Sequence, residues 1–192
     1  MTAPKRDAAA TRARILAAAT AEFATHGIAG ARVDRIAVAA QANKNMIYIY
    51  FGSKEQLFDG VLAEAIEQLL ETVPMDATDL PGYAGALYDH MVRHPDLSRL
   101  ARWFGLEKPG GFLELEEAMT NTLAKINRIA AAQADGLVTN ELAPDQIVAL
   151  VVGITATWSA GSPELADVEV SAELIESRRA AVVLVVARMV AP

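Results

Sequence analysis

Apolar residues recur every three or four positions along most of the chain, and this spacing predicts helices. In the first such stretch, residues 11–26, the side chains of Ile15, Ala19 and Phe23 stand four apart and share one helix face. The same pattern predicts further helices at about 33–40, 44–51, 54–72, 82–94, 96–107, 112–135, 144–159 and 172–190. The C-terminal valines could signal a strand, but no partner strand is visible in the sequence. We therefore expect an all-α fold.

The predicted helix ends carry residues that suit them. Asn43, Ser53 and Ser171 can each cap a helix by accepting a hydrogen bond from a free backbone N–H. Gln56, three residues after Ser53, completes a capping-box pattern. Gly27 suits the left-handed backbone geometry that commonly closes a helix. These signals support the boundaries drawn from the apolar spacing.

The same pattern divides the chain into parts. The helix predicted at 54–72 has a wide apolar stripe, which suggests contacts on two sides, and a polar connector at 74–81 follows it. Residues 1–10 have no apolar anchor, so we expect a flexible arm there. We expect a small helical domain at 11–57 and a larger helical body at 58–192.

Charge is distributed unevenly between these parts. Residues 1–54 hold eight Lys or Arg and three Asp or Glu, a balance of +5, whereas the rest of the chain carries −12 and the whole chain −7. A basic end on an acidic body is typical of a protein that contacts phosphate with one end only, although chance clustering would give the same counts.

Composition narrows the class of protein further. The chain has no cysteine, which excludes a disulfide framework and a thiolate metal site. Its first residues lack the apolar core of a secretory signal, and its longest apolar run, 180–187, is too short to cross a membrane. We expect a cytoplasmic protein with no membrane contact.

The two-turn helix from Lys44 is the most informative stretch. Ile47 and Phe51 stand four apart and can pack inward together, whereas Lys44, Asn45, Met46, Tyr48 and Ile49 point outward or sideways. A helix this short is unstable alone in water, so its neighbours must support it. We therefore expect it to present an outer face.

Residues 11–57 resemble the DNA-binding domain of the tetracycline-repressor (TetR) family of bacterial transcription regulators. The resemblance is carried by TRARILAAATAEFATHG, VDRIAVAA and the spaced pattern K-x-x-I-Y-x-Y-F-x-S-K-E-x-L. It implies an N-terminal three-helix domain with a helix-turn-helix at about 33–52, joined by the helix at 54–72 to an all-helical ligand-binding and dimerisation domain. The chain departs from the family at Arg32, where a threonine N-cap is usual, and at Gln41, where glycine is common.

The resemblance implies that the helix from Lys44 enters the major groove of double-stranded DNA. Lys44 suits a guanine edge or a phosphate, and Asn45 suits an adenine edge or a phosphate. Met46 offers apolar contact, for example to a thymine methyl, and the Tyr48 hydroxyl suits a phosphate. Arg32 and Lys54 stand at predicted helix N-termini, where backbone N–H groups already attract anions, so their charges suit phosphates as well. Tyr50 is as easily explained by core packing. The candidate DNA-binding residues are Arg32, Asn43, Lys44, Asn45, Met46, Tyr48, Ile49, Tyr50 and Lys54.

The resemblance also implies a homodimer that reads a palindromic operator. In the family, the last two helices of each subunit form a four-helix bundle, and the run at 180–187 is apolar on every side, as a helix buried all round would be. The alternative is that these residues fill a monomer's core. The candidate interface residues are Ile147, Val151, Ile154, Trp158, Val182, Val183 and Val186.

Family members hold a small molecule between helices of the body, and its binding changes the separation of the two recognition helices. Large side chains of the middle helices are the candidates here, although residues of this kind are more often core than pocket lining. Their character favours a hydrophobic or aromatic ligand. The candidate ligand-binding residues are Tyr88, Met91, Trp103, Phe104, Met119 and Trp158.

Signs of catalysis are weak. The sequence has no Gly-rich phosphate loop, nucleophile elbow or HExxH motif. His90 and His94 have metal-ligand spacing, with Asp89 or Asp96 as a possible third ligand, but a solvated helix face explains them equally well. Three acidic residues near a helix start are explained by the helix dipole: Glu114, Glu116 and Glu117.

We therefore expect no metal, no cofactor and no enzyme activity. The predicted function is a repressor released from DNA by a small molecule. Two rivals remain open: an enzyme or carrier that uses a pocket in the body, and a DNA-binding protein without a ligand.

Overall fold

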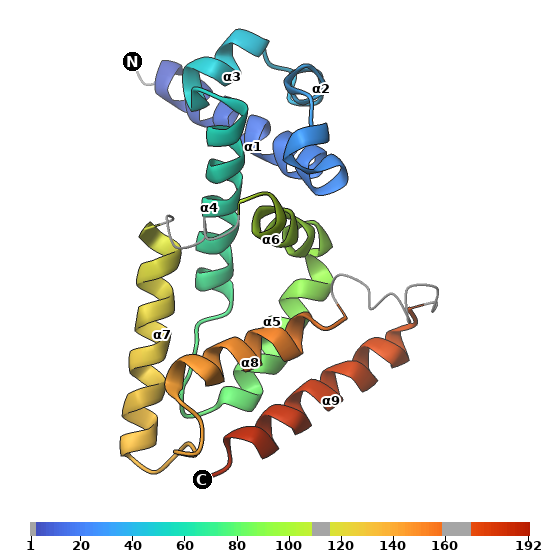
Figure 1. The fold of residues 1–192 in the computed structure, drawn as a ribbon. Coiled ribbons are helices and arrows are strands. Elements are labelled where there is room, and N and C mark those ends of the chain that lie inside the picture. The colour runs from blue at the N-terminus through green and yellow to red at the C-terminus, as the bar shows by residue number, and fades with distance from the viewer. Residues whose placement is uncertain (1–2, 109–115, 159–169) are drawn as a thin grey trace.

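Three helices form a small head above a larger helical body, and α4 runs from one into the other (Figure 1). The computed structural model describes residues 3–108, 116–158 and 170–192, and all regular structure in these ranges is helical. The head contains α1 (Ala3–Gly30), α2 (Val33–Ala39) and α3 (Lys44–Phe51), followed by α4 (Lys54–Thr72). The body contains α5 (Leu80–Arg93), α6 (Pro95–Glu107), α7 (Glu116–Ala134), α8 (Pro144–Ala156) and α9 (Ala172–Val190).

The first helix is longer than expected. It begins at Ala3 rather than Thr11, inside the segment expected to be an arm. The residues added to its start are rich in alanine, the strongest helix former, and Pro4 falls in the first turn, where its missing N–H removes no helical bond. Local propensity therefore extends the helix without any apolar anchor.

A kink at Gly27 ends the regular part of α1, as expected. Gly27 has a φ of 65° and a ψ of −178°, which interrupts the helix before one more turn reaches Gly30. A Cβ atom at this position would lie 2.7 Å from Glu107 Oε1 and 3.0 Å from a ring carbon of Trp103. Glycine is thus required both by the backbone angle and by the approach of α6.

The core of the head continues into the body. Phe23 meets Phe58 of α4 edge to face with ring centroids 5.0 Å apart, and Phe58 stacks on Phe104 of α6 at 6.0 Å. Trp103 packs against the same cluster. Trp103 and Phe104, which were expected to line a ligand cavity, pack in or against this core, because aromatic packing draws this end of α6 into the head.

The caps around α3 follow the sequence signals in most respects. Asn43 Oδ1 accepts a hydrogen bond from the Asn45 backbone N–H at 2.9 Å, and Ser53 Oγ accepts one from Gln56 N–H at 3.1 Å. The reciprocal half of the predicted capping box is replaced, because the Ser53 N–H donates to the Phe51 carbonyl at 2.9 Å.

Helix bounds in the body differ from expectation by a few residues. Helix α5 begins at Leu80, because Asp79 caps it by accepting from the Gly82 N–H. Helix α8 ends at Ala156, short of residue 159. Helix α9 is capped by Ser171 as predicted, with Leu174 N–H as the donor. The start predicted for α7, residues 112–115, lies outside the described residues.

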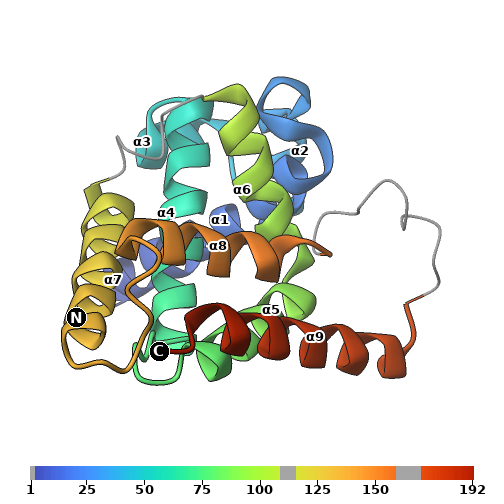
Figure 2. The same ribbon diagram turned by 60° about the horizontal axis from the view of Figure 1, so that its bottom comes forward.

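Helices α8 and α9 lie side by side against α5 and run in opposite directions (Figures 1 and 2). One face of each helix is buried in the core of the same chain. That core contains Ile147 and Val151 of α8, and Val182 and Val186 of α9. Throughout the described ranges, no helix is long and apolar enough to cross a membrane.

Candidate DNA-binding surface and ligand cavity

Helix α3 is anchored by Ile47, with Tyr50 and Phe51 packed against the same core, and exposes the side chains of its other face. Ile47 is 2 % exposed and anchors the helix in the head core, whereas Tyr48 is 42 % and Ile49 79 % exposed. Asn43, Lys44 and Asn45 are exposed at its N-terminal end. Met46 and Tyr50 are half-buried, and Tyr50 packs against the core cluster. The polar groups suited to DNA thus gather at the first turn of a rigidly supported helix.

An acidic residue that the sequence analysis did not single out faces this surface. Lys44 Nζ lies 2.8 Å from Asp34 Oδ1, a carboxylate in the first turn of α2. The hydrogen bond from Lys44, together with its charge, lowers the pKa of Asp34, and the same contact raises the pKa of Lys44. The ammonium group is therefore held across the helix-turn-helix, where a phosphate would compete with Asp34 for it.

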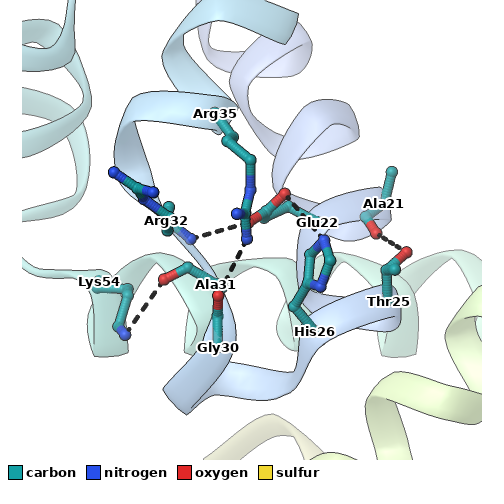
Figure 3. Close-up of polar contacts among 9 residues, drawn as sticks. All are labelled: Ala21, Glu22, Thr25, His26, Gly30, Ala31, Arg32, Arg35 and Lys54. Atoms are coloured by element: carbon teal, nitrogen blue, oxygen red, sulfur yellow. Dashed lines mark hydrogen bonds and ion pairs between the residues drawn. The ribbon is translucent and has the colours of Figure 1, made fainter.

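Glu22 organises the start of α2 in place of the missing N-cap (Figure 3). Its Oε1 accepts from the Arg32 backbone N–H and from Arg35 Nε, each at 2.8 Å, and Arg35 also donates to the Gly30 carbonyl at 3.0 Å. Burial raises the pKa of Glu22, but the bonds from Arg35 and Arg32 outweigh it and leave that pKa lowered. This network fixes the residue before α2 without capping the first N–H groups of the helix, and it leaves the Arg32 side chain pointing away from it.

Lys54 is also held from within the head. Its Nζ donates to the Ala31 carbonyl oxygen at 3.4 Å, which places the charge beside the connection between α1 and α2 (Figure 3). Gln41, in the turn before α3, adopts a φ of 50°. The turn therefore keeps the left-handed backbone geometry even though glycine is absent. A residue with a side chain adopts this geometry at a cost in conformational energy.

A cavity of about 470 Å³ lies between α4, α5, α6, α7 and α8. Its lining is mostly apolar, as is usual for small-molecule sites of this size. Of the residues predicted to bind a ligand, Met91 lines it. Other apolar lining residues are Leu62, Ile66, Leu69, Leu87, Ile126 and Val148.

The remaining predicted ligand residues lie elsewhere. Tyr88 and Trp158 line a separate cavity of about 160 Å³ together with Met91, and their rings meet edge to face at 6.3 Å. Met119 of α7 lines neither cavity. The sequence identified large side chains but could not show where a cavity lies. The cavity is lined by residues from five helices, and the spacing within one helix does not show how the helices pack together.

The histidine pair lies at the wall of the larger cavity. His90 and His94 both line it, with ring centroids 4.6 Å apart, and His90 Nδ1 lies 3.2 Å from Thr72 Oγ1. Asp89, one of the possible third metal ligands, instead accepts a bifurcated bond from the single N–H of Arg179 Nε, which lies 3.0 Å from Oδ1 and 2.8 Å from Oδ2. Of the acidic residues near the start of α7, Glu114 and the side chains of Glu116 and Glu117 lie outside the described residues.

The predicted interface residues are only partly available to another subunit. Ile147, Val151, Val182 and Val186 are at most 2 % exposed, because they fill the core between α5, α8 and α9. Ile154, Trp158 and Val183 are half-buried. The outer face of these two helices instead shows other apolar side chains, chiefly Leu150, Leu184 and Val185. A run that is apolar all round has one side in the core and the other exposed.

Two family models match the chain. "Bacterial regulatory proteins, tetR family" matches residues 15–61, and "Tetracyclin repressor-like, C-terminal domain" matches residues 79–188. Together they cover most of the head and the body.

Individual relatives agree with these models. The transcriptional repressor SCO4008 of Streptomyces coelicolor is 42 % identical over 162 residues, which are 83 % of each chain. The repressor NicS of Pseudomonas putida is 38 % identical over 93 residues, 45 % of this chain and 44 % of NicS. The crystal structure of the regulator SCO4942 of Streptomyces coelicolor superposes with a TM-score of 0.79 at 42 % identity, over 94 % of this chain and 98 % of that one. This chain therefore belongs to the TetR family of DNA-binding transcriptional regulators, and it is not an enzyme.

Proposed function

We propose that this protein is a homodimeric repressor that binds a palindromic operator and is released by a small molecule bound in its body. The observation that carries the proposal is the exposed N-terminal end of α3. Asn43, Lys44 and Asn45 lie there, on a helix that the buried Ile47 anchors in the head. A helix supported in this way can enter the major groove without reorganising the head.

The roles of the DNA-binding residues follow from their positions. Residues 11–57 form the DNA-binding part, in which Lys44, Asn45 and Met46 read base edges. Phosphates are contacted by charged or hydroxyl groups at the margins of α3, namely Arg32, Tyr48 and Lys54. Asn43, Ile49 and Tyr50 complete the surface. Sequence is thus read by the first turn and position is fixed by the flanks.

The dimer forms through the outer faces of α8 and α9, within the body at 58–192. Leu150 and Gly153 stand three apart on α8, and Leu184 and Val185 are exposed on α9. Among the described residues, no atom beyond the local backbone of α8 lies within 4 Å of the place where a Cβ of Gly153 would be, so a helix of another subunit can approach closely. Association of two such faces buries apolar surface that one chain leaves exposed.

Helix α6 connects the ligand cavity to the head, which supports release by a ligand. Leu97 and Ala101 line the cavity, whereas Phe104 and Glu107, further along the same helix, contact α4 and α1. A ligand that favours another position of α6 would shift the head and spoil the spacing of the two recognition helices. It does so only as far as its affinity differs between the two arrangements.

A gel-shift experiment at fixed salt tests the DNA-binding part of the proposal. The probe is the intergenic DNA upstream of this gene, and the control protein carries Lys44→Ala together with Tyr48→Ala. We expect the wild type to shift the probe and the control to require much more protein. If the two proteins shift it equally, or if neither does, the assignment of α3 is wrong.

A further inference from the structure

His90 is a polar residue almost completely enclosed in apolar surroundings. It is 5 % exposed, it lines the larger cavity, and its Nε2 atom has no hydrogen-bond partner among the described residues. A buried polar atom without a partner is costly, and native proteins satisfy almost all such atoms. The position of this one beside a cavity suggests that its partner is a ligand.

The other ring nitrogen identifies which kind of partner is required. Thr72 has one hydroxyl proton, which it donates to the Gln68 carbonyl at 2.7 Å. Thr72 Oγ1 can then only accept from His90 Nδ1, 3.2 Å away, so Nδ1 carries the ring proton. In a neutral imidazole, Nε2 is left with a lone pair and is an acceptor.

The surroundings favour this neutral form. Burial lowers the pKa of His90, and the charges of His94 and Arg93 lower it further, so the ring does not take a second proton near neutral pH. The pattern of donors and acceptors around the ring therefore stays fixed. Nε2 faces a ligand as an acceptor and not as a cation.

His94 is the side chain in a position to cover this atom. Nε2 is shielded from solvent, and the exposed His94 ring lies 4.6 Å from the His90 ring and lines the same cavity. Because His94 is at the surface end of α5, its side chain can turn aside without disturbing the core. A ligand that reaches Nε2 displaces it.

We propose that the effector of this protein is an apolar molecule bearing a hydroxyl or N–H group, which it donates to His90 Nε2. This inference rests on the proposed ligand-binding role of the body and specifies the chemistry of that site. An apolar body fills the space lined by Leu62, Ile66, Leu69 and Val148, and one donor at its end fixes its orientation. Lys125 and Asp145 also line the cavity, but at His90 Nε2 itself a carboxylate is disfavoured because it would meet a lone pair.

Three biphenyl compounds that differ in one substituent test this chemistry. 4-Phenylphenol carries a donor, 4-methoxybiphenyl has an acceptor only, and biphenyl-4-carboxylate is an anion. Calorimetric titration of the full-length protein should show the phenol binding about tenfold more tightly than the ether, which is the effect of one buried hydrogen bond. Equal binding of phenol and ether, tightest binding by the carboxylate, or binding of none of them would overturn the proposal.

Two substitutions at Thr72 provide a matched pair. Thr72→Val removes the acceptor that holds the proton on Nδ1, so the proton can move to Nε2 and the preference for the phenol should shrink. Thr72→Ser keeps the hydroxyl and should keep the preference. His90→Phe should abolish it. Loss of the preference in Thr72→Ser, or its retention in His90→Phe, would count against the role of His90.

A spectroscopic measurement needs no ligand. Long-range proton–nitrogen correlation spectra of the histidine rings should show His90 protonated on Nδ1 in the wild type, and a proton on Nε2 would overturn the inference.

Gel shifts with the same compounds separate this proposal from the proposed function. Selective binding of the phenol without release of DNA would disprove ligand release and leave the chemistry of the cavity in place. Release by phenol and ether alike would do the reverse.

Discussion

The carboxylate of Glu107 accepts a hydrogen bond from the backbone N–H of Ile28, with 2.9 Å between Oε1 and N. This contact ties the C-terminal end of α6 to the kink in α1, at the point where Gly27 lets α6 approach. Because the other end of α6 lines the ligand cavity, the bond joins a helix of the cavity wall to the head. It is local evidence for mechanical coupling of the two parts.

Replacing Glu107 should show the value of this bond. In Glu107→Ala the buried Ile28 N–H loses its acceptor, and we expect the free energy of unfolding to fall by about 1–2 kcal/mol. Glu107→Gln keeps an acceptor oxygen at the same reach and should lose less. Urea denaturation of the two variants beside the wild type measures the difference. Equal losses would mean that the negative charge of Glu107 matters and the bond does not.

Asp34→Asn should strengthen binding to DNA. The substitution removes a negative charge near the phosphates and releases Lys44 from its partner 2.8 Å away. We expect tighter binding to all sequences and a salt dependence steeper by about one unit for each subunit. Gel shifts over a salt series measure both. Asp135→Asn, at the end of α7, is the control, and an equal gain there would indicate an effect of net charge alone.

The fold was predictable because its signals are local. Apolar spacing gave each helix, and side chains such as Asn43 and Ser53 marked where the helices begin. The clearest failure, at the start of α1, has a local cause as well, since alanine-rich sequence forms helix without a core to support it. Local rules thus accounted for the elements and most of their ends.

The candidate sites were less predictable because they depend on distant residues. Nothing near Lys44 in the sequence indicates that Asp34 would be its partner, although both lie in a short helix-turn-helix. Phe104 is a large aromatic residue of the kind that often lines a pocket, yet it stacks on Phe58, 46 positions earlier in the chain. Burial against another helix cannot be read from the spacing within one helix.

His90 should make stability depend on pH. In the folded protein its pKa is lowered from 6.5, mainly because the ring is buried. As pH falls, the unfolded chain therefore takes up the proton at a higher pH than the folded protein does. Between pH 6.5 and the lower folded value the unfolded state binds more protons, and the free energy of unfolding therefore decreases as pH falls through this window. His90→Phe should flatten that part of the curve. Parallel curves for the two proteins would contradict the prediction.

Leu184→Glu should convert the dimer to monomers. Leu184 is 51 % exposed on the outer face of α9, and a carboxylate there would be buried without a partner on association. Leu123→Glu is the matched control, because Leu123 is also 51 % exposed in a helix but lies on α7. Sedimentation velocity measures the masses. If the control dissociates and Leu184→Glu does not, the interface lies on the other side of the body.

Tyr48 and Lys54 should contribute to DNA binding in different ways. Tyr48→Phe removes only a neutral hydroxyl, so binding should weaken by about tenfold while its salt dependence stays unchanged. Lys54→Ala removes a cation that releases counterions, so the slope should fall by about one unit for each half-site. Arg128→Ala, in the body, should alter neither quantity. A salt series of gel shifts distinguishes the cases, and an unchanged slope in Lys54→Ala would mean that the ammonium group serves the Ala31 carbonyl alone.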